Sequence, residues 1–313
     1  MSEKLHYRGR IGQISIYLGK MLRMFVYQND WKVLPMAALI GGLVTFAVGP
    51  NMYVTQEGTI SGCFALICAC VWNGFFNSIQ VICRERPIVK REHRSGMHIT
   101  SYIAAHMIYQ MMLCLLQTGI ILMIVDVAGL KVHSAGLISK YLLVDMGITM
   151  FLTTYAADML SLAISAFVKN TTAAMTVMPF VMIFQLVFSG GLIPLTGPSA
   201  IFTDYTITKW GLQSLCTLGD YNSQPMVTLW NTIWKFRAME VDGQKPIKLM
   251  TDYILKNNKL DEVLLESGMY NGEKAYEYIS SNVTHCWTML GIMVIVFAAA
   301  AVIILEFVDK DRR

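Results

Sequence analysis

Polar side chains recur at regular spacing inside long apolar stretches of this chain, and they are the first candidates for chemistry. Asn73, Asn77 and Gln80 follow i, i+4, i+7 spacing, which places them in one stripe on a helical face. Carboxamides in apolar surroundings turn toward partner helices or toward a cavity. Two interpretations therefore stay open: hydrogen bonds between helices, or the lining of a route through the protein. Other apolar stretches contain Gln110, Gln117, Asp145, Asp158 and Gln185.

Asp158 is the residue of this set whose burial costs most, because a carboxylate without a partner is strongly disfavoured away from water. We expect it to pair with a nearby hydroxyl, of Thr153, Thr154 or Ser161, or with a basic side chain at the inner membrane face. A second interpretation is that Asp158 is a proton-sensitive group.

Residues 84–98, RERPIVKREHRSGMH, form the most charged stretch in the first half of the chain and lie between two apolar runs. Proline suits the first turn of a helix, so we expect Pro87 to end the preceding helix and to begin a short new one. The charges of this short helix could pair with a cytoplasmic partner, or they could only anchor the chain at the membrane edge. Pairing is favoured because anchors would not need the acidic residues Glu85 and Glu92. The other charged side chains are Arg86, Lys90, Arg91 and Arg94.

Short motifs of common catalytic sites do not occur in the sequence. It has no GxxxxGK[ST] phosphate loop, no HExxH zinc motif and no GxSxG nucleophile elbow. His93, His98 and His106 do not line up on one helical side, so metal ligation is not expected. Cys216 and Cys286 could form a disulfide in an oxidising compartment. We expect neither an enzyme active site nor a cofactor bound by this chain.

Composition explains why the polar residues are embedded in apolar sequence. The 313 residues are 55% hydrophobic and 15% charged, which is too apolar for an ordinary soluble domain. About 20 helical residues cross the ~30 Å of bilayer hydrocarbon, so apolar runs of this length are candidate spans. Six such runs predict an all-α polytopic membrane protein with six transmembrane helices. They cover residues 33–50, 60–83, 100–125, 141–168, 173–195 and 287–308.

The distribution of basic residues predicts the orientation. Lys and Arg gather before the first run, in 84–94 after the second run, and in 310–313 after the sixth. Basic loops are retained in the cytoplasm, whereas long loops cross the membrane largely regardless of charge. We therefore expect both termini in the cytoplasm and residues 196–285 outside, in the plasma membrane of a bacterial cell.

Segments outside the six runs also carry helical patterns. Residues 10–28 place apolar side chains on one face, with Lys20 and Arg23 on the other, which predicts an amphipathic helix along the inner membrane surface. Residues 199–218, which follow the helix-breaking sequence FSGGLIPLTGP, predict a re-entrant or interfacial hairpin. Residues 226–239 and 246–266 each predict one helix of an external cap.

The chain is thus expected to have four parts. These are 1–30, the cytoplasmic N-terminus with the amphipathic helix; 31–195, spans one to five with a short helix at about 85–97; 196–285, the hairpin and external cap; and 286–313, the sixth span with a cytoplasmic tail.

This arrangement resembles the membrane domain of the ABCG, or White, subfamily and its bacterial type-2 ABC permease relatives. The resemblance covers essentially the whole chain. It rests on the order of the elements, on an ER-P-x-x-x-RE-H segment after the second span, and on an FSG-x-L helix end after the fifth. The matching residues are Glu85, Arg86, Arg91, Glu92, His93, Gly96 and Tyr102, and then Phe188, Ser189, Gly190 and Leu192.

The resemblance implies a role for each of these segments. The helix at about 85–97 would be the coupling helix that inserts into an ATP-binding subunit, and two protomers would enclose a central cavity between their second and fifth spans. Counted without gaps from Glu85, a family phenylalanine of that cavity falls on Asn73, which departs from the family pattern; Phe75 or Phe76 would take its place only in a different register. The implied coupling residues are Glu85, Arg86, Lys90, Arg91 and Glu92; the translocation path Asn73, Phe76, Asn77 and Gln185; and the gate Leu192 and Ile193.

The expected function follows from the resemblance. The chain would be the permease subunit of an ATP-driven exporter, in a homo- or heterodimer, with ATP and Mg²⁺ bound by separate ATPase subunits on the cytoplasmic face. White-type chains carry a fused nucleotide-binding domain that this sequence does not contain before the amphipathic helix. The alternative is a membrane sensor or immunity protein whose external cap binds a peptide. Lipids, lipophilic drugs and antimicrobial peptides all suit the expected cavity.

Overall fold

The computed structural model describes residues 9–27, 30–129, 135–191, 197–240 and 243–310. Throughout these ranges the fold is helical and contains no β-strand. Five helices are long and apolar enough to span a membrane, and a further apolar helix, α7 (Thr171–Val187), is shorter at 17 residues. The five are α2 (Val33–Val48, continued by a 3₁₀ turn), α3 (Gln56–Ser78), α5 (Ile99–Val127), α6 (Leu142–Phe167) and α12 (Ser280–Lys310). The predicted all-α class is confirmed, and a helix lies at each predicted run.

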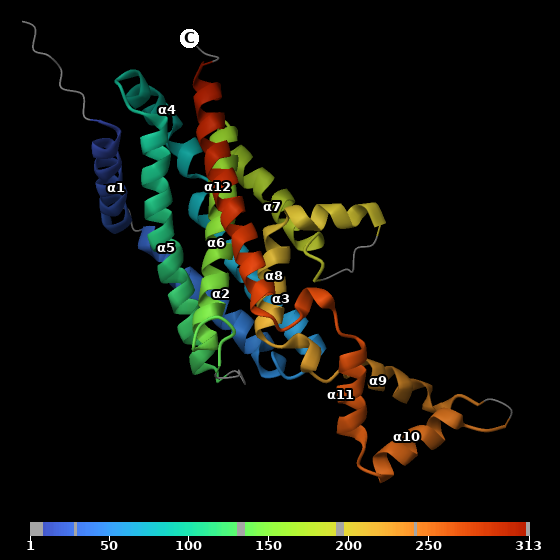
Figure 1. The fold of residues 1–313 in the computed structure, drawn as a ribbon. Coiled ribbons are helices and arrows are strands. Elements are labelled where there is room, and N and C mark those ends of the chain that lie inside the picture. Colours follow the sequence, from blue (N-terminus) through green and yellow to red (C-terminus); the bar gives the residue numbers. More distant parts are fainter. Residues whose placement is uncertain (1–8, 28–29, 130–134, 192–196, 241–242, 311–313) are drawn as a thin grey trace, which may run out of the picture.

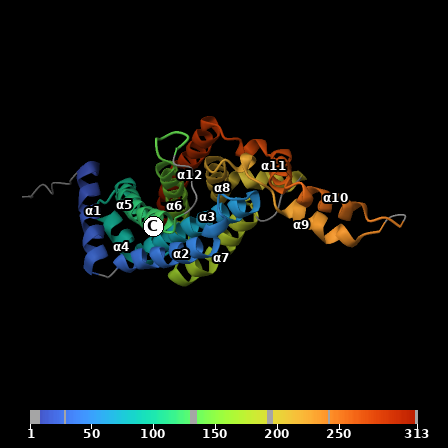
Figure 2. The same cartoon turned by 90° about the horizontal axis from the view of Figure 1, so that it is seen from below.

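Helix α6 is the centre of the bundle. It packs against α3, α5, α12 and α8 (Ile207–Leu218), and the end-on view shows it between these helices (Figure 2). Small side chains allow membrane helices to approach closely. At Gly74 of α3 a Cβ atom would lie 2.3 Å from the backbone oxygen of Thr154 in α6. This helix pair therefore requires glycine at position 74.

Helix α1 (Arg10–Tyr27) confirms the extent of the predicted amphipathic helix. It packs against α5, and Met21 is buried in that contact while Ile11 and Leu22 are exposed. Figure 2 shows α1 from the side, at the edge of the bundle. The helix therefore has one face on α5 and leaves a second apolar face uncovered.

Helix α4 (Val81–Arg94) corrects the predicted role of Pro87. The helix begins at Val81, and Pro87 lies in its interior rather than in its first turn. The first amides of a helix have no partner within it, and here the Ser165 hydroxyl of α6 accepts from the N–H groups of Ile82 (3.1 Å) and Cys83 (3.2 Å). This tertiary contact lies at the start of α4. The prediction that Pro87 begins the helix was therefore wrong.

The segment between α7 and α12 contains both buried and projecting parts. A 3₁₀ stretch, η3 (Gly197–Tyr205), leads into α8, which is buried among α3, α6 and α12. Beyond α8, residues 226–240 and 243–270 form an arm that extends sideways at the end of the molecule opposite α4 and the C-terminus (Figure 1). The arm contains α9 (Thr228–Lys235), α10 (Pro246–Lys256) and α11 (Leu260–Tyr270). Shorter 3₁₀ turns are η1 (Asp30–Lys32), η2 (Gly49–Asn51), η4 (Tyr221–Ser223), η5 (Phe236–Ala238) and η6 (Lys274–Tyr276).

The arm corrects one further prediction. Residues 246–266 were expected to form one helix, but α10 and α11 are separate helices with a turn between them. Asn258 in that turn has φ of 51°, a left-handed conformation that asparagine tolerates and that ends a helix. The charge and leucine pattern continues through the turn and therefore concealed the break.

Candidate functional site

Charged side chains attach α4 to three neighbouring helices. Arg86 donates to the carbonyl oxygens of Val168 (2.8 Å) and Ala166 at the C-terminal end of α6. The last carbonyls of a helix have no partner within it, and a guanidinium there supplies charge-assisted hydrogen bonds. Arg86 therefore caps α6 from α4 and links the two helices directly.

Glu85 and Glu92 attach α4 to α1 and α5. Glu85 accepts from the Lys20 ammonium of α1 and from the Tyr102 hydroxyl of α5, both at 3.4 Å. Glu92 accepts from the Tyr17 hydroxyl of α1 at 2.9 Å. Burial, together with the hydrogen bond to Glu92, raises the pKa of Tyr17 above its ordinary value, so its hydroxyl remains a donor at neutral pH.

A carboxamide of α1 holds the turn after α4. The Gln13 side chain donates to the Gly96 carbonyl at 3.2 Å and accepts from the His98 amide at 2.9 Å. Gly96 has φ of 101°, a conformation that favours glycine. The α4–α5 turn is thus fixed from both sides of its backbone.

The opposite face of α4 is exposed. Arg84, Pro87, Ile88 and Arg91 lie on it at spacings of three and four residues, and Ile88 is 39% exposed. Of the five predicted coupling residues, Glu85, Arg86 and Glu92 bond within the chain, and Lys90 is half-buried. Arg91 is the one among those five that stands fully on the outer face. The coupling assignment itself stays a prediction.

A network of polar side chains connects α3, α5 and α6 inside the bundle. The carboxamides of Asn77 and Gln117 exchange two hydrogen bonds, at 2.9 and 3.0 Å. Gln110 donates to the Ser78 hydroxyl at 2.8 Å, and Ser78 donates to Asp158 of α6. Asn77 of the polar stripe and Gln110 of α5 thus form hydrogen bonds between helices, as the first of the two interpretations expects.

The partners of Asp158 correct the sequence prediction. Its carboxyl group contacts the Ser78 hydroxyl and the Cys114 thiol (3.4 Å), on α3 and α5. The hydroxyls expected to pair with it are bonded elsewhere, to the backbone carbonyls of Thr149, Met150 and Phe75. Thr153 and Thr154 share α6 with Asp158 and bond to the i−4 carbonyls of that helix, whereas Ser161 bonds across to the Phe75 carbonyl of α3.

Sequence reasoning missed Ser78 and Cys114, although a signal was present. Gln110, Cys114 and Gln117 follow the same i, i+4, i+7 spacing on α5 that Asn73, Asn77 and Gln80 show earlier in the chain. Each polar stripe is expected to face a partner helix or a cavity, so the second stripe was a candidate partner for the first. In the structure the Asn77 and Gln117 pair is the contact between them.

The residues predicted to line a translocation path differ in burial and in hydrogen bonding. Asn73 is buried and its amide nitrogen has no hydrogen-bond partner, whereas Phe76 is 46% exposed. Gln185 is buried on α7; its side-chain oxygen accepts from the Ile207 amide at 2.8 Å, and its carbonyl accepts from Thr208. Gln185 therefore joins α7 to the start of α8, and its place in a translocation path stays a prediction.

The predicted gate residues, Leu192 and Ile193, lie outside the described residues. The helix before them ends as the sequence suggested, with α7 stopping at Val187 and Gly190 adopting φ of 78°. The Ser189 hydroxyl donates to the Leu186 carbonyl at 2.7 Å and accepts from the Gly191 amide at 3.1 Å. These bonds satisfy backbone groups at the end of α7.

The remaining candidates have local roles. Asp145 accepts from the backbone amides of Ile138 and Ser139 at 3.0 Å and so fixes the loop before α6. Cys216 and Cys286 are buried free thiols. Among the described residues, His, Cys, Asp and Glu form no group of three suited to a metal ion.

Comparison with known proteins adds the family. The membrane domain of the ABC-2 type transporters matches residues 15–202, which is more than half of the chain. The match begins in α1, includes α4 with its contacts to α1, α5 and α6, and ends in η3.

A relative agrees with this match. An ABC transporter ATP-binding/permease protein of Mycobacterium tuberculosis is 34% identical over 147 residues. The aligned part covers 45% of this chain and 16% of the relative, so the chain spans a small part of that protein's length. With the matched region and the long apolar helices taken together, the chain belongs to the ABC-2 type transporter family and is a multi-pass membrane permease domain of that family.

Proposed function

We propose that the chain is the permease subunit of an ATP-driven exporter and that α4 couples its membrane helices to the ATPase subunits. The observation that carries this proposal is the division of α4 into two faces. One face is bonded to α1, α5 and α6 through Glu85, Arg86 and Glu92. The other face presents Ile88 and Arg91 to solvent. A helix that is attached on one side and free on the other can transmit movement of a partner.

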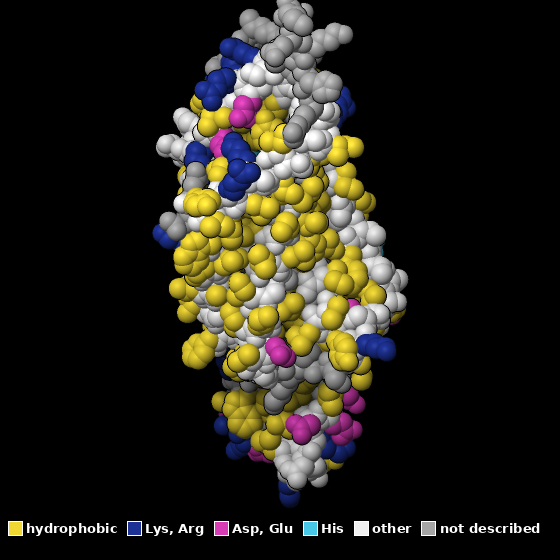
Figure 3. Space-filling model, turned by 90° about the vertical axis from the view of Figure 1, so that its left-hand side faces the viewer, with side chains coloured by type: hydrophobic (Ala, Val, Ile, Leu, Met, Phe, Trp, Pro, Cys, Tyr) yellow, Lys and Arg dark blue, Asp and Glu magenta, His cyan; other side chains and the backbone are white. Residues whose placement is uncertain are grey.

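The proposed topology places α4 on the cytoplasmic side. Helix α4 and the C-terminal end of α12 lie at the same end of the molecule (Figure 1). Lys and Arg lie at that end, above a belt of apolar side chains, whereas at the other end they are mixed with Asp and Glu (Figure 3). Basic residues favour the cytoplasmic side. In this arrangement both termini lie in the cytoplasm of a bacterial cell, and α2, α3, α5, α6, α7 and α12 cross the plasma membrane.

The same topology assigns the other parts of the chain. Residues 1–30 contain α1 at the inner membrane surface, and residues 31–195 hold the first five spans. Residues 196–285 form the re-entrant segment and the external cap, to which the arm belongs. Residues 286–313 complete the sixth span and the cytoplasmic tail.

Movement of α4 would reach the bundle by two routes. Arg86 connects it to the C-terminal end of α6, the central helix. Glu85 and Glu92 connect it to Lys20 and Tyr17 of α1. Binding of ATP and Mg²⁺ by the ATPase subunits would supply the free energy, as in other systems in which ATP drives domain movement.

The proposed translocation path lies between two permease protomers. Asn73 and Phe76 on α3 are the candidates to line it, because the Asn73 amide nitrogen is unbonded and the Phe76 ring is exposed. Asn77 and Gln185 would support the path by fixing α5 and α8 to it. Leu192 and Ile193 would close it as an apolar gate, since an apolar constriction excludes water.

Charge reversal on the free face of α4 tests the proposal. Arg91→Glu is expected to reduce co-purification of the ATPase at least about tenfold, because a like charge placed in a complementary interface costs several kcal/mol. The matched control is Lys248→Glu on the exposed face of α10, which introduces the same charge change at the opposite end. Unchanged ATPase binding and stimulation by Arg91→Glu, in a folded permease, would overturn the coupling role of α4.

A further inference from the structure

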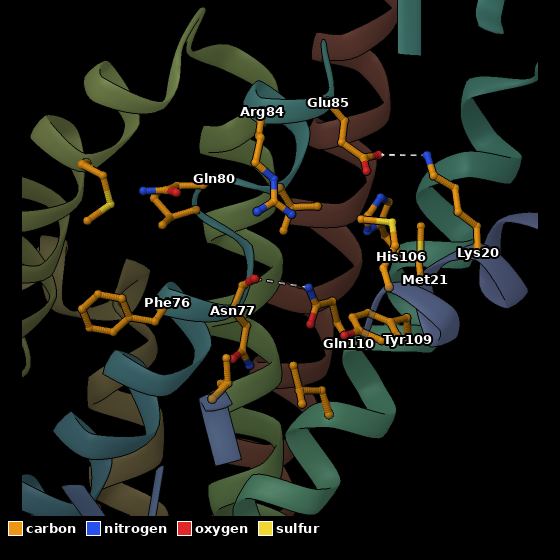
Figure 4. A pocket seen from close by; sticks show the side chains of 16 residues that line it. Lys20, Met21, Phe76, Asn77, Gln80, Arg84, Glu85, His106, Tyr109 and Gln110 are labelled. Atoms are coloured by element: carbon orange, nitrogen blue, oxygen red, sulfur yellow. Dashed lines mark hydrogen bonds and ion pairs between the residues drawn. The ribbon is translucent and has the colours of Figure 1, made fainter. Parts of the chain in front are cut away.

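A cavity of about 260 Å³ lies where α1 meets the junction of α3 and α4, with α5 as its far wall. Figure 4 shows Lys20 and Met21 of α1 on one side and Gln80 and Arg84 on the other, with His106 and Gln110 of α5 between them. The volume is smaller than the pockets that enclose drug-sized ligands. It suits a small polar group.

Two buried side chains at this cavity have polar atoms without partners. His106 is 3% exposed, and neither of its ring nitrogens has a hydrogen-bond partner. Gln110 is 1% exposed; its amide nitrogen donates to Ser78, but its side-chain oxygen is unbonded. Buried polar atoms are almost always satisfied, because leaving them unbonded costs free energy. A molecule in the cavity would restore these bonds.

The types of these atoms specify what the molecule carries. A neutral imidazole offers one donor and one acceptor, and the Gln110 oxygen is an acceptor. Hydroxyl groups complement this set, because each can donate and accept. The His106 ring packs against the Tyr102 ring in a T-shaped arrangement, with ring centroids 4.6 Å apart.

The charge at the cavity is positive. Lys20 is paired with Glu85 at 3.4 Å. The exposed Arg84 guanidinium makes no hydrogen bond or ion pair with any part of the chain that the structure describes. An unpaired guanidinium is suited to bind a phosphate through two parallel hydrogen bonds.

The remaining lining and the location point to a lipid. Apolar side chains of Met24, Phe76, Leu113 and Met175 continue from the polar part of the cavity. On the face over α1 and α5, basic side chains at one end give way to an apolar belt (Figure 3). The cavity combines both kinds of lining, as expected at the level where headgroups meet acyl chains.

We infer that this cavity binds an anionic glycerophospholipid with a hydroxylated headgroup, of the phosphatidylglycerol type. Arg84 binds the phosphate, His106 and Gln110 bind the headgroup hydroxyls, and an acyl chain follows the apolar side chains. The bound lipid fills the space between α1, α4 and α5 and so stabilises the attachment of α4. The inference requires a chain embedded in a membrane and does not depend on transport or on its direction.

The test measures lipid retained by the full-length chain. The protein is purified in detergent from membranes that contain phosphatidylglycerol and phosphatidylethanolamine, and the bound lipid is quantified by mass spectrometry. Wild-type protein is expected to retain phosphatidylglycerol preferentially. His106→Phe keeps an aromatic ring without polar atoms, and Arg84→Gln removes the charge; each is expected to lower that retention about tenfold. Equal retention by the wild type and both variants would overturn the site.

Matched controls separate this site from general effects. His98→Phe and Arg94→Gln change the same residue types at exposed positions that do not line the cavity, and both are expected to retain lipid like the wild type. If a variant is misfolded, the wild-type protein is tested alone: phosphatidylglycerol or phosphatidylcholine is added, and the displacement of the retained lipid is measured. Phosphatidylglycerol is expected to displace it more effectively. Equal displacement by both lipids would contradict the inference. Soluble glycerol phosphate is tested as a third ligand. Its binding as tightly as the lipid would assign the cavity to a soluble phosphoester and overturn a lipid site.

Discussion

The end of the bundle that carries α4 and the arm at the other end are joined to the membrane helices in different ways. Helix α4 bonds through charged side chains to α1, α5 and α6. The arm bonds mainly to the first turn of α3: Gln56 donates to the Gly268 carbonyl at 2.8 Å, and Glu57 accepts from the Val227 amide at 3.0 Å. One region therefore connects several helices, and the other is attached to one.

The arm also has a different surface. Its internal contacts include the Arg237–Asp252 ion pair and the packing of the Arg237 guanidinium over Trp234, 4.4 Å from the ring centroid. Leu249 and Tyr253 of α10 are 65% and 63% exposed. Substitutions around α4 should therefore affect the whole bundle, whereas the effects of substitutions on the arm should stay local.

Arg86→Ala should have the largest effect. It removes two charge-assisted hydrogen bonds to α6 and leaves carbonyl groups there without a partner, at a cost of about 2–4 kcal/mol. Thermal unfolding in detergent measures the loss, and coupling to the ATPase should fall with it. Arg94→Ala, an exposed arginine on the same helix, serves as the control and should change stability little. Equal unfolding temperatures for the two variants would contradict the capping role.

Asp158→Ala should come next, because it removes the shared acceptor of Ser78 and Cys114. Hydrogen bonds between membrane helices contribute about 0.6–1.7 kcal/mol, and we expect a loss of that size by the same measurement. Thr153→Val is the control: its hydroxyl bonds within its own helix, to Thr149, and the substitution nearly preserves shape. A larger loss for Thr153→Val than for Asp158→Ala would argue against the network.

Loss of the Tyr17–Glu92 hydrogen bond between α1 and α4 should lower the unfolding free energy by a smaller amount. Tyr17→Phe and Glu92→Gln should each cost about 0.5–1.5 kcal/mol, and a double-mutant cycle should show that the two losses are not additive. Additive losses would mean that the hydroxyl and the carboxylate do not interact in solution.

Tyr17 also predicts a pH dependence. Its pKa is raised in the folded protein above the ordinary value of 10.0, first by burial and then by Glu92. Its contribution is therefore complete below pH 10 and declines as the pH rises above that value, because only the unfolded state then loses the proton. The stability difference between the wild type and Tyr17→Phe should shrink in that direction. A difference that grows above pH 10 would reverse the sign and refute the assignment.

Leu249→Ser and Tyr253→Ser on the arm should have the smallest effect. Both side chains are mostly exposed, so the unfolding free energy should change by less than about 0.5 kcal/mol. ATPase binding should also stay unchanged. Destabilisation comparable to that of Arg86→Ala would show that the arm is as firmly integrated as α4.

The positions of the helices could be predicted from the sequence because hydrophobic runs and 3.6-residue spacing are local signals. They located α1 and a helix at each apolar run. The start of α4 could not be predicted, because it depends on Ser165, which comes from a helix far along the chain. The turn at Asn258 was likewise hidden beneath a continuous pattern of charge and leucine.

The chemistry of the site was less predictable than the fold. The charges of α4 were found, but their division into a bonded and a free face required the positions of Tyr17, Lys20 and the end of α6. Asp158 was recognised as costly, yet its partners lie on other helices. Spacing shows which residues share a face, and only packing shows which face they meet.

Photocross-linking from the free face of α4 tests the central claim most directly. A benzoylphenylalanine at position 91 in place of arginine is compared with one at position 248 in place of lysine, in membranes of the native host. We expect position 91 to form a cross-link to an ATP-binding subunit, identified by mass spectrometry, and position 248 to form none. A cross-link to the ATP-binding subunit from position 248, or none from position 91 in an intact complex, would contradict the coupling role of α4.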